Sequence, residues 1–425
     1  MATVGVVAGL VGLAAYVYGP ATHGTLTKLG AFRELASFPL ANANDFISIQ
    51  DTTHCEDLHY YAPANTLFTA CEDVSATRFK WFPPLTIYSD PNHAWKARGS
   101  VHIIDPETKE SKRLAFENFD GPFITHGIDV ISDPGLENEA VYILAINRVP
   151  NGAVFPRDGT KPEVDPGSTP KVASRIEVFH HKLGSSTIKH VQSISHPLIK
   201  TPNDLYAVSP TEIYVTNDHH YFEGLWRKAE DLWPGAKWSN VIHATVSEDG
   251  SVEAEAVVEK LNGPNGLAHG RTKDEILLAS APGGRFWIAD RPTETKAIVL
   301  GEQIDLDSTI DNPSWFSDTY ADEATGDASG FVLGGLTRAI DLPKIGHDPK
   351  GREGVMVWHV VPNKTEPGKW DKKLLWQDDG SKVRNAATAV LVGIDPKKED
   401  GEKKAWLFVT GFSSENTVAV KVSLN

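Results

Sequence analysis

The sequence predicts an all-β protein: a six-bladed β-propeller with an N-terminal hydrophobic helix. Two observations support this fold class. Beyond residue 40, the apolar runs are short, are bounded by Gly, Pro, Asn and Asp, and contain no long helical pattern, which is typical of strands. These runs also recur in six similar pairs along the chain, which indicates a repeat architecture.

Each pair consists of a first short run, which in five of the six cases combines an acidic or amide residue with apolar ones, then a turn and a second, more apolar run. The first runs cover residues 56–63, 126–133, 203–210, 264–271, 311–318 and 387–394, and the second runs include NTLFTACE, VYILAINR, EIYVTNDH, EILLASAP, GFVLGGL and AWLFVTGF. One marker in each first run gives spacings of 72, 75, 62, 47 and 75 residues; the markers are Glu56, Ile128, Asn203, Asn265, Asn312 and Ala387. A repeat of about 65 residues exceeds the usual blade length, and long loops such as 148–171 account for the excess. The alternative is an irregular two-domain β protein.

Composition limits the possible partners. The chain has 425 residues, of which 40% are hydrophobic, so it can bury a core. Its 41 Lys and Arg against 56 Asp and Glu give a net charge of −15. An acidic surface repels phosphate backbones, so we expect no nucleic-acid partner.

The N-terminus differs from the rest of the chain. Residues 2–19 carry no charged side chain, and the segment approaches the length of a membrane span. No basic residue precedes it, which favours an uncleaved signal-anchor; a cleaved signal peptide and a buried helix are the alternatives. We therefore divide the chain into a hydrophobic segment, 1–22, and a propeller, 23–425, and expect a membrane-anchored or secreted protein of the secretory pathway. There, the sequon at Asn363 would be available for glycosylation.

The chain has two cysteines, Cys55 and Cys71. The segment between them is predicted to be a strand, a turn and a strand. The cysteines form either one disulfide between neighbouring strands or two buried free thiols, and a secretory route permits the disulfide.

Polar residues recur at the first positions of the inner strands. They are Glu56-Asp57, Asn203-Asp204, Asn265 and Asp311-Asn312. A single Asn or Asp pair is usually a turn cap, but four at matching places in a propeller would converge on the central channel. Carboxylate and amide oxygens without His or Cys are the ligands that Ca²⁺ prefers. The sequence contains no nucleophile elbow, zincin, P-loop or dinucleotide-binding motif.

Several stretches, in order, resemble the serum paraoxonase/arylesterase family. They are HCEDLHYYAPANTLFTA, ITHGIDV, IKTPNDLYAVSPTEIYVTNDHHYF, LNGPNGLAHG and IDLDSTIDNPSW, and the resemblance covers most of the chain from about residue 25 onward. It implies a six-bladed propeller with two calcium ions in its channel that hydrolyses lactones and aryl esters. It also implies a hydrophobic N-terminus that is retained.

The resemblance assigns roles by position. The ligands of a catalytic calcium would be Glu56, Asn203, Asn265, Asp311 and Asn312, and those of a deeper structural calcium Asp57, Asp204 and the backbone carbonyl of Ile128. His126 falls on the family's general-base histidine. Asp218 and His219 match a supporting pair beside the site, or else form a plain hydrogen bond within a blade. The mouth loops 79–85 and 218–226 would set specificity.

The chain also departs from the family pattern. Arg148 stands where the second histidine of the proposed dyad would be; arginine cannot relay a proton, and its charge should lower the pKa of a nearby histidine. Either His126 acts alone, or a calcium-bound carboxylate such as Asp311 is the base. No cysteine near the C-terminus can tie the ring closed, so closure should depend on strand pairing, and the family's free-thiol position falls at Gly334 or Gly335. The alternatives are a calcium-stabilised propeller that binds a ligand or partner without turnover, and a relative of gluconolactonase or strictosidine-synthase type with another substrate.

Overall fold

The computed structural model describes residues 22–424 except 163, 166 and 324. The charge-free segment 2–19 lies outside the described residues, so its interpretation as a signal-anchor stays a prediction. Within the described part of the chain, no helix combines the length and apolar character needed to cross a bilayer.

The described chain forms six four-stranded antiparallel blades, of which the first two are joined into one eight-stranded sheet. The first blade contains β2 (Cys55–Tyr61), β3 (Thr66–Cys71), β6 (Ser100–Ile104) and β7 (Ser111–Glu117). The second contains β8 (Thr125–Ser132), β9 (Ala140–Pro150), β10 (Val172–Lys182) and β11 (Thr187–Ile194), and the third β12 (Pro202–Ser209), β13 (Glu212–Asn217), β14 (Ser239–Val246) and β15 (Val252–Leu261). A short parallel pairing of β7 with β11 joins the outer edges of the first two blades.

The remaining three blades complete the ring. The fourth contains β16 (Pro264–His269), β17 (Glu275–Ser280), β18 (Arg285–Asp290) and β19 (Val299–Asp305), and the fifth β20 (Pro313–Phe316), β21 (Gly330–Leu336), β22 (Val355–Pro362) and β23 (Trp370–Asp378). The sixth combines β24 (Ala386–Gly393), β25 (Lys404–Gly411) and β26 (Thr417–Ser423) with the N-terminal β1 (Phe46–Ile49). The innermost strand of each blade contacts that of the next, and β24 contacts β2, so the ring is closed.

Closure depends on strand pairing between the two ends of the propeller. β1 is hydrogen-bonded to β26, with Phe46 opposite Val420 and Ile49 opposite Thr417. The prediction that the ring closes without a disulfide across its ends is confirmed. The one disulfide joins Cys55 and Cys71, directly opposite each other on β2 and β3, so the free-thiol alternative is wrong.

The blades are held together by apolar side chains between neighbouring sheets. Each of six buried clusters spans two adjacent blades; Leu144 and Ile176 of the second blade, for example, share a cluster with Leu205 and Val215 of the third. This explains why the second run of each predicted pair is almost continuously apolar: those strands lie inside the blade and are covered on both faces.

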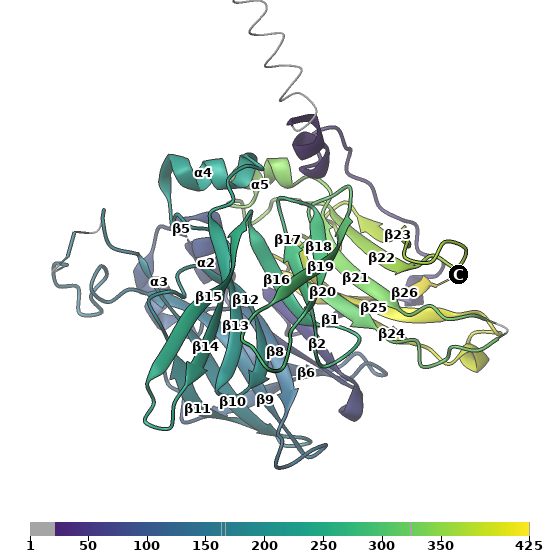
Figure 1. Cartoon of the computed structure of the whole chain (residues 1–425), viewed down its shortest axis with the longest axis horizontal. Helices are drawn as coiled ribbons and strands as arrows, with labels where there is room; N and C mark the ends of the chain where they lie inside the picture. Colours follow the sequence, from purple (N-terminus) through teal and green to yellow (C-terminus); the bar gives the residue numbers. More distant parts are fainter. Residues whose placement is uncertain (1–21, 163, 166, 324, 425) are drawn as a thin grey trace, which may run out of the picture.

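Short helices and one hairpin cover a single mouth of the ring. They include α4 (Gly224–Leu232), α5 (Leu342–Ile345) and the hairpin of β4 (Trp81–Phe82) and β5 (Ile87–Tyr88), with η3 (Pro83–Leu85) between its strands. Figure 1 shows α4 and α5 on the same side of the disc. The remaining helices are α2 (Ser75–Arg78), α3 (Pro91–Lys96), η1 (Ala43–Asp45), η2 (Ala62–Ala64), η4 (Ala339–Asp341), η5 (Pro396–Lys398) and a turn of helix at 22–28.

Candidate metal centre and active-site cavity

A repeated β-bulge directs the predicted site residues to the channel. In five of the six inner strands, one extra residue interrupts the pairing with the neighbouring strand: a step of three residues on the inner strand faces a step of two on its partner. The steps run from Cys55 to Leu58, Thr125 to Ile128, Pro202 to Leu205, Pro264 to Leu267 and Ala386 to Ala389. A bulge re-aims side chains that a regular strand would send to opposite faces. The residues inside the bulges are Glu56-Asp57, His126-Gly127, Asn203-Asp204, Asn265-Gly266 and Ala387-Thr388.

Two glycines in these bulges allow the inner strands to approach one another closely. A Cβ at Gly127 would lie 2.4 Å from Asp204 Oδ1, and one at Gly266 would lie 2.5 Å from the Cα of Asn312. Glycine is therefore required at both positions, because any side chain would push the neighbouring blade away from the channel.

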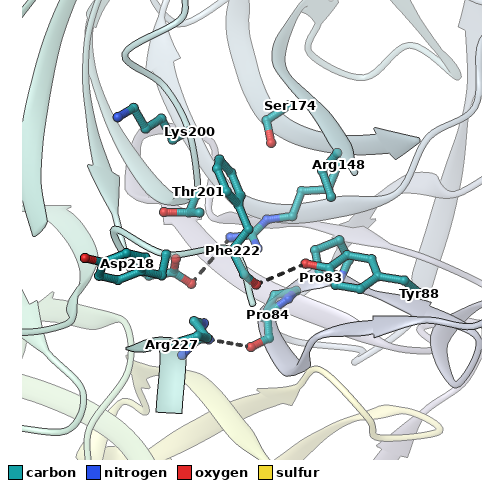
Figure 2. A pocket seen from close by; sticks show the side chains of 12 residues that line it. Pro83, Pro84, Tyr88, Arg148, Ser174, Lys200, Thr201, Asp218, Phe222 and Arg227 are labelled. Atoms are coloured by element: carbon teal, nitrogen blue, oxygen red, sulfur yellow. Dashed lines mark hydrogen bonds and ion pairs between the residues drawn. The ribbon is translucent and has the colours of Figure 1, made fainter. Parts of the chain in front are cut away.

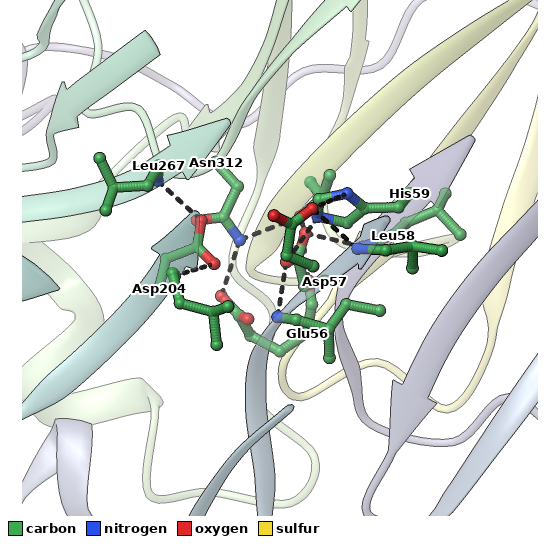
Figure 3. A network of polar contacts seen from close by, with 12 residues as sticks. Glu56, Asp57, Leu58, His59, Asp204, Leu267 and Asn312 are labelled. Carbon is green, nitrogen blue, oxygen red and sulfur yellow. Dashed lines mark hydrogen bonds and ion pairs between the residues drawn. The ribbon is translucent and has the colours of Figure 1, made fainter. Parts of the chain in front are cut away.

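The five predicted ligands of the catalytic calcium converge in the channel. Each has one side-chain oxygen that is buried and accepts no hydrogen bond from the residues that the structure describes; the atoms are Glu56 Oε2, Asn203 Oδ1, Asn265 Oδ1, Asp311 Oδ1 and Asn312 Oδ1. Asn312 Nδ2 donates to Glu56 Oε1 at 3.1 Å, which turns its own oxygen elsewhere (Figure 3). Buried acceptors are almost always paired, so five unpaired oxygens at one place fit a cation.

Burial and neighbouring carboxylates act on the two acids in this layer. Burial, Asp311 and Asp57 raise the pKa of Glu56 well above its ordinary value. Burial, Asp57 and Asp218 raise the pKa of Asp311 to about 7. A divalent cation among these oxygens would stabilise both carboxylates in their charged form.

The donor set is unusual in its composition. Nowhere in the described part of the chain do three His, Cys, Asp or Glu side chains form a group that could hold a metal ion. The five converging residues comprise only two carboxylates, Glu56 and Asp311, and three amides. Such a set has low formal charge and consists only of oxygen, which suits Ca²⁺ rather than a transition metal.

The residues predicted to hold a deeper ion have a different environment. Burial raises the pKa of Asp57, but His59, the amide of Ile128 and Thr388 outweigh burial, so the pKa is lowered overall. Burial alone would lower the pKa of His59, but the effect of Asp57 and Asp129 is larger, and together they raise this pKa to about 9. Burial, Asp57 and Glu56 raise the pKa of Asp204 well above its ordinary value.

His126 lies beside the candidate ligands. Its Nε2 is 3.2 Å from Asn203 Nδ2, so the amide nitrogen of Asn203 faces the imidazole and its unpaired oxygen is free. Burial, Arg148 and Arg78 lower the pKa of His126 well below its ordinary value. The prediction that Arg148 lowers the pKa of a nearby histidine is confirmed, and His126 is neutral near pH 7.

Arg148 is buried and only partly neutralised. It donates to the carbonyl of Pro202, and its nearest carboxylate contact is Asp218 Oδ2 at 3.8 Å. Its Nε is buried and has no hydrogen-bond partner among the described residues. Figure 2 shows Arg148 beside Asp218 in a small side pocket whose wall also includes Arg227.

Asp218 and His219, the predicted supporting pair, do border the site. His219 Nδ1 is 3.0 Å from Asp218 Oδ1, and its Nε2 is 2.9 Å from Asp231 on α4. Arg227 of the same helix contacts Asp231 at 2.7 Å and donates to the carbonyl of Pro84. The pair therefore anchors α4 over the mouth, which is more than a bond within one blade.

A cavity of about 600 Å³ opens from this layer toward the mouth. Its floor includes His126, Asn203, Asn265 and Asp311. Apolar side chains from the hairpin, α5 and the loop after β25 line its walls, namely Phe82, Leu85, Leu342 and Phe412. Of the mouth loops expected to set specificity, both 79–85 and 218–226 contribute residues to this wall.

Three residues near the channel were not singled out from the sequence. Thr388 Oγ1 donates to Asp57 Oδ1 at 2.7 Å, His59 Nε2 is 3.2 Å from Asp57 Oδ2, and Asp129 is buried on β8. Thr388 follows the marker Ala387, as Asp57 follows the marker Glu56. The alignment of the repeats could therefore have identified Thr388 as a residue near the channel. His59 and Asp129 lie further along their strands, outside the polar pairs used as markers.

Comparison with known proteins finds relatives of similar sequence. An arylesterase family model matches residues 167–329. Serum paraoxonase/arylesterase 1 of Mus musculus is 25% identical over 323 residues, which is 75% of this chain and 76% of the relative. Serum paraoxonase/lactonase 3 of Oryctolagus cuniculus is 22% identical over 304 residues, covering 70% and 73%.

Among solved structures, a luciferin-regenerating enzyme aligns with a TM-score of 0.42 and 12% identity, covering 89% of this chain and 94% of that one, a similarity too low to support an inference. The family model covers the middle of the propeller, and the two paraoxonase relatives align with 70–75% of the chain. The chain is thus similar in sequence to the serum paraoxonase/arylesterase family, as its ordered motifs indicate.

Proposed function

We propose that the protein is a calcium-dependent hydrolase of carboxylic esters, of the lactonase or arylesterase type. The observation that carries the proposal is a group of five buried, unpaired oxygens in the channel, beneath an apolar-walled cavity. Three of the five residues, Asn203, Asn265 and Asp311, form part of the cavity floor. The relatives' names, arylesterase and lactonase, support the reaction class. An ester or lactone has an apolar body and one polarisable carbonyl, which matches apolar walls above a polar floor.

Glu56, Asn203, Asn265, Asp311 and Asn312 would hold the calcium. When bound, Ca²⁺ supplies Lewis-acid polarisation of the substrate carbonyl and stabilises the negative charge that develops on its oxygen. The chain contributes preorganisation: Asn312 is held by Glu56 and by Thr388, and Asn203 is held by His126.

Activation of water is assigned to Asp311, and His126 is assigned a positioning role. Asn203 Nδ2 faces Nε2 of His126, so in this orientation the imidazole proton lies on Nδ1 and no free lone pair remains. Asp311 lines the cavity and keeps one oxygen unpaired, so it can accept a proton from a water molecule on the cavity floor. Arg148 cannot relay that proton, since a guanidinium stays protonated.

The test is a hydrolysis assay of the purified full chain. The substrates are a panel of γ- and δ-lactones and phenyl acetate, each measured with Ca²⁺, after treatment with a chelator, and after Ca²⁺ is restored. We expect turnover that is lost with the chelator and recovered with Ca²⁺ but not with Mg²⁺, because the amide-rich floor suits a larger ion. If no substrate is hydrolysed in a calcium-dependent way, the proposal is wrong.

The second candidate function is a calcium-stabilised propeller that binds a ligand without turnover. Arg148 favours it, because a buried cation stands where a second proton-transferring histidine would be. In that case the same panel would give no turnover, while chelation would still lower the melting temperature of the protein.

We also propose that the chain associates with a membrane at the mouth side of the disc. Residues 2–19 carry no charge, and the described chain begins beside this mouth. On and after α4, Leu225, Trp226, Leu232 and Trp233 are each at least half exposed. Such apolar side chains suit a bilayer interface. Flotation with lipid vesicles should recover the full chain, and Leu225→Ser with Trp226→Ser should weaken its binding; equal recovery of both proteins would contradict this proposal.

A further inference from the structure

Three buried carboxylates form a repeated pattern deeper in the channel. Each accepts the backbone amide of the next residue in its own strand and a backbone amide from the inner strand of the following blade. The pairs are Asp57 with Leu58 and Ile128 at 2.8 and 2.9 Å, Asp129 with Val130 and Ala207 at 2.7 and 2.7 Å, and Asp204 with Leu205 and Leu267 at 2.8 and 2.8 Å. These carboxylates therefore join β2 to β8, β8 to β12, and β12 to β16.

Asp57 has no acceptor capacity left. Besides its two backbone amides, it accepts the hydroxyl of Thr388 at 2.7 Å and contacts His59 Nε2 at 3.2 Å (Figure 3). The two oxygens of a carboxylate have about four lone-pair positions, and here four donors fill them. Asp129 is filled in a similar way, since His269 Nε2 lies 2.9 Å from its Oδ2 and His59 Nδ1 lies 3.4 Å from its Oδ1.

The layer of Glu56, Asn203, Asn265, Asp311 and Asn312 differs sharply from this deeper layer. Each of those five residues keeps a buried oxygen without a hydrogen-bond partner, whereas neither Asp57, Asp129 nor Asp204 has such an atom among the described residues. Ca²⁺ takes six to eight oxygens, and Asp204 with one backbone carbonyl would supply too few of them from the chain. The free coordinating capacity is thus confined to one layer.

We infer that the channel holds a single divalent ion, in the layer of Glu56 and Asp311, and that Asp57 is a hydrogen-bond acceptor rather than a metal ligand. His59, Thr388 and the backbone amide of Ile128 occupy the positions that a second ion would use at Asp57. The inference rests on the calcium site of the proposed function. It replaces the two-ion expectation that the family resemblance carries.

The experiment counts ions rather than turnover. Full-length protein is stripped with a chelator, and Ca²⁺ binding is measured by calorimetric titration together with elemental analysis of the dialysed protein. We expect one ion per chain. Glu56→Gln should weaken or abolish binding of that ion, whereas Asp57→Asn should keep one ion per chain while lowering the melting temperature.

A gain of binding provides a second, independent test. His59→Glu removes one donor from Asp57 and adds two oxygens beside it, so we expect the variant to bind two ions per chain. The matched control is His23→Glu, an identical change at an exposed position of the 22–28 helix, and it should still bind one ion.

The outcomes separate this inference from the proposed function. Two ions in the unmodified protein, with one lost in Asp57→Asn, would overturn the single-ion inference and leave the calcium-dependent hydrolase intact. The single-ion inference would also be overturned if Asp57→Asn lost the only ion while its circular dichroism spectrum showed that the variant is still folded. If the unmodified protein binds no ion, the calcium site of the proposed function fails, and the inference fails with it. If His59→Glu does not fold, the ion count of the unmodified protein decides.

Discussion

Arg148 changes what its neighbours can do. It is buried beside Asp218, and together with burial it lowers the pKa of His126, so the imidazole stays neutral and holds the amide of Asn203. A neutral donor-acceptor ring is well suited to orient an amide, while a carboxylate on the cavity floor is better placed to accept a proton. In the proposed mechanism, the charge at position 148 is therefore the reason why His126 has a positioning role and Asp311 the role of the base.

This assignment predicts different kinetics for two variants. His126→Gln keeps a side chain that can face the Asn203 amide, and we expect kcat to fall by about tenfold or less, with calcium content unchanged. Asp311→Asn should lower kcat by about a hundredfold or more, which is the usual loss of a general base. Both rates are measured at saturating Ca²⁺, with the bound ion counted in each variant. The reverse order of losses would return the base to His126.

Calcium affinity and activity should fall together when a coordinating amide is removed. Asn265→Ala deletes one of the five unpaired oxygens, and we expect the affinity for Ca²⁺ to drop by at least about tenfold, since even partners outside the ligand set have effects of that size. Calorimetry and the lactone assay measure the two quantities. Asn92→Ala, an exposed asparagine on α3, is the matched control and should leave both unchanged.

Much of the site was predictable from the sequence because its residues mark the start of each repeat. Glu56, Asn203, Asn265 and Asn312 are polar residues at equivalent positions of four runs, and the ring brings equivalent positions together. His59, Asp129 and Thr388 were not found, because their importance comes from contacts across blades. Asp57 meets Thr388, for example, more than 300 residues away in the chain.

At the scale of elements, the β-bulge explains why two consecutive residues can both face the channel. All six pairs of strands were predicted correctly, because apolar run length and turn residues are local signals. The bulges were not predicted, since a bulge is a property of the register between two strands rather than of either strand alone. Blade five lacks this bulge in its inner strand, and Asp311 and Asn312 instead lie just before β20.

The first hairpin should depend on its disulfide. Cys55 and Cys71 close a segment with a sequence separation of 16, and both are buried. Cross-linking a loop of this size stabilises a fold by about 3 kcal/mol. We expect the double variant Cys55→Ala, Cys71→Ala to unfold at a lower denaturant concentration. A reducing agent should shift the unmodified protein toward the variant and leave the variant unaffected; if reduction shifts both equally, the bridge is not the cause.

Two buried histidines in the blades predict a loss of stability in mild acid. Burial and Arg113 lower the pKa of His102 on β6 to about 4, and burial lowers that of His359 on β22 to about 4. Between pH 6.5 and pH 4 the unfolded chain takes up protons that these folded sites refuse, so the free energy of unfolding falls by about 1.4 kcal/mol per pH unit for each histidine. Denaturation series across this range measure the slope.

The control for this slope is the double variant His102→Gln, His359→Gln. The variant is less stable near neutral pH, but its stability should change less between pH 6.5 and pH 4. An unchanged slope would show that other groups cause the acid sensitivity.

At the scale of the whole molecule, the fold is one closed ring whose two ends form the same blade. The sequence predicted the number of blades and a closure without a terminal disulfide. It did not show which strand β26 would meet, because pairing between segments so far apart leaves no local signal. The location inferred from the apolar segment 2–19, membrane-anchored or secreted, stays a prediction.

Closure of the ring by β1 predicts that two similar substitutions, each of an apolar side chain by alanine, have unequal effects on stability. Ile49 is buried between the sixth and first blades, so Ile49→Ala should destabilise the protein by about 2–5 kcal/mol. Val191 on the outer strand β11 is 50% exposed, and Val191→Ala should change stability by no more than about 0.5 kcal/mol. Denaturant midpoints compare the two. Equal shifts would mean that the pairing of β1 contributes little to holding the ring together.

The pairing of Phe46 with Val420 also has a consequence for how the protein is made. Translation produces β1 before the other strands and β26 after them, so the sixth blade stays incomplete until the rest of the propeller has been made. The apolar edge next to the first blade is exposed during that time, and the entropy of bringing distant segments together delays closure further. We therefore expect the nascent chain to need protection by chaperones until β26 has emerged, and a chain that stops before β26 not to close its ring.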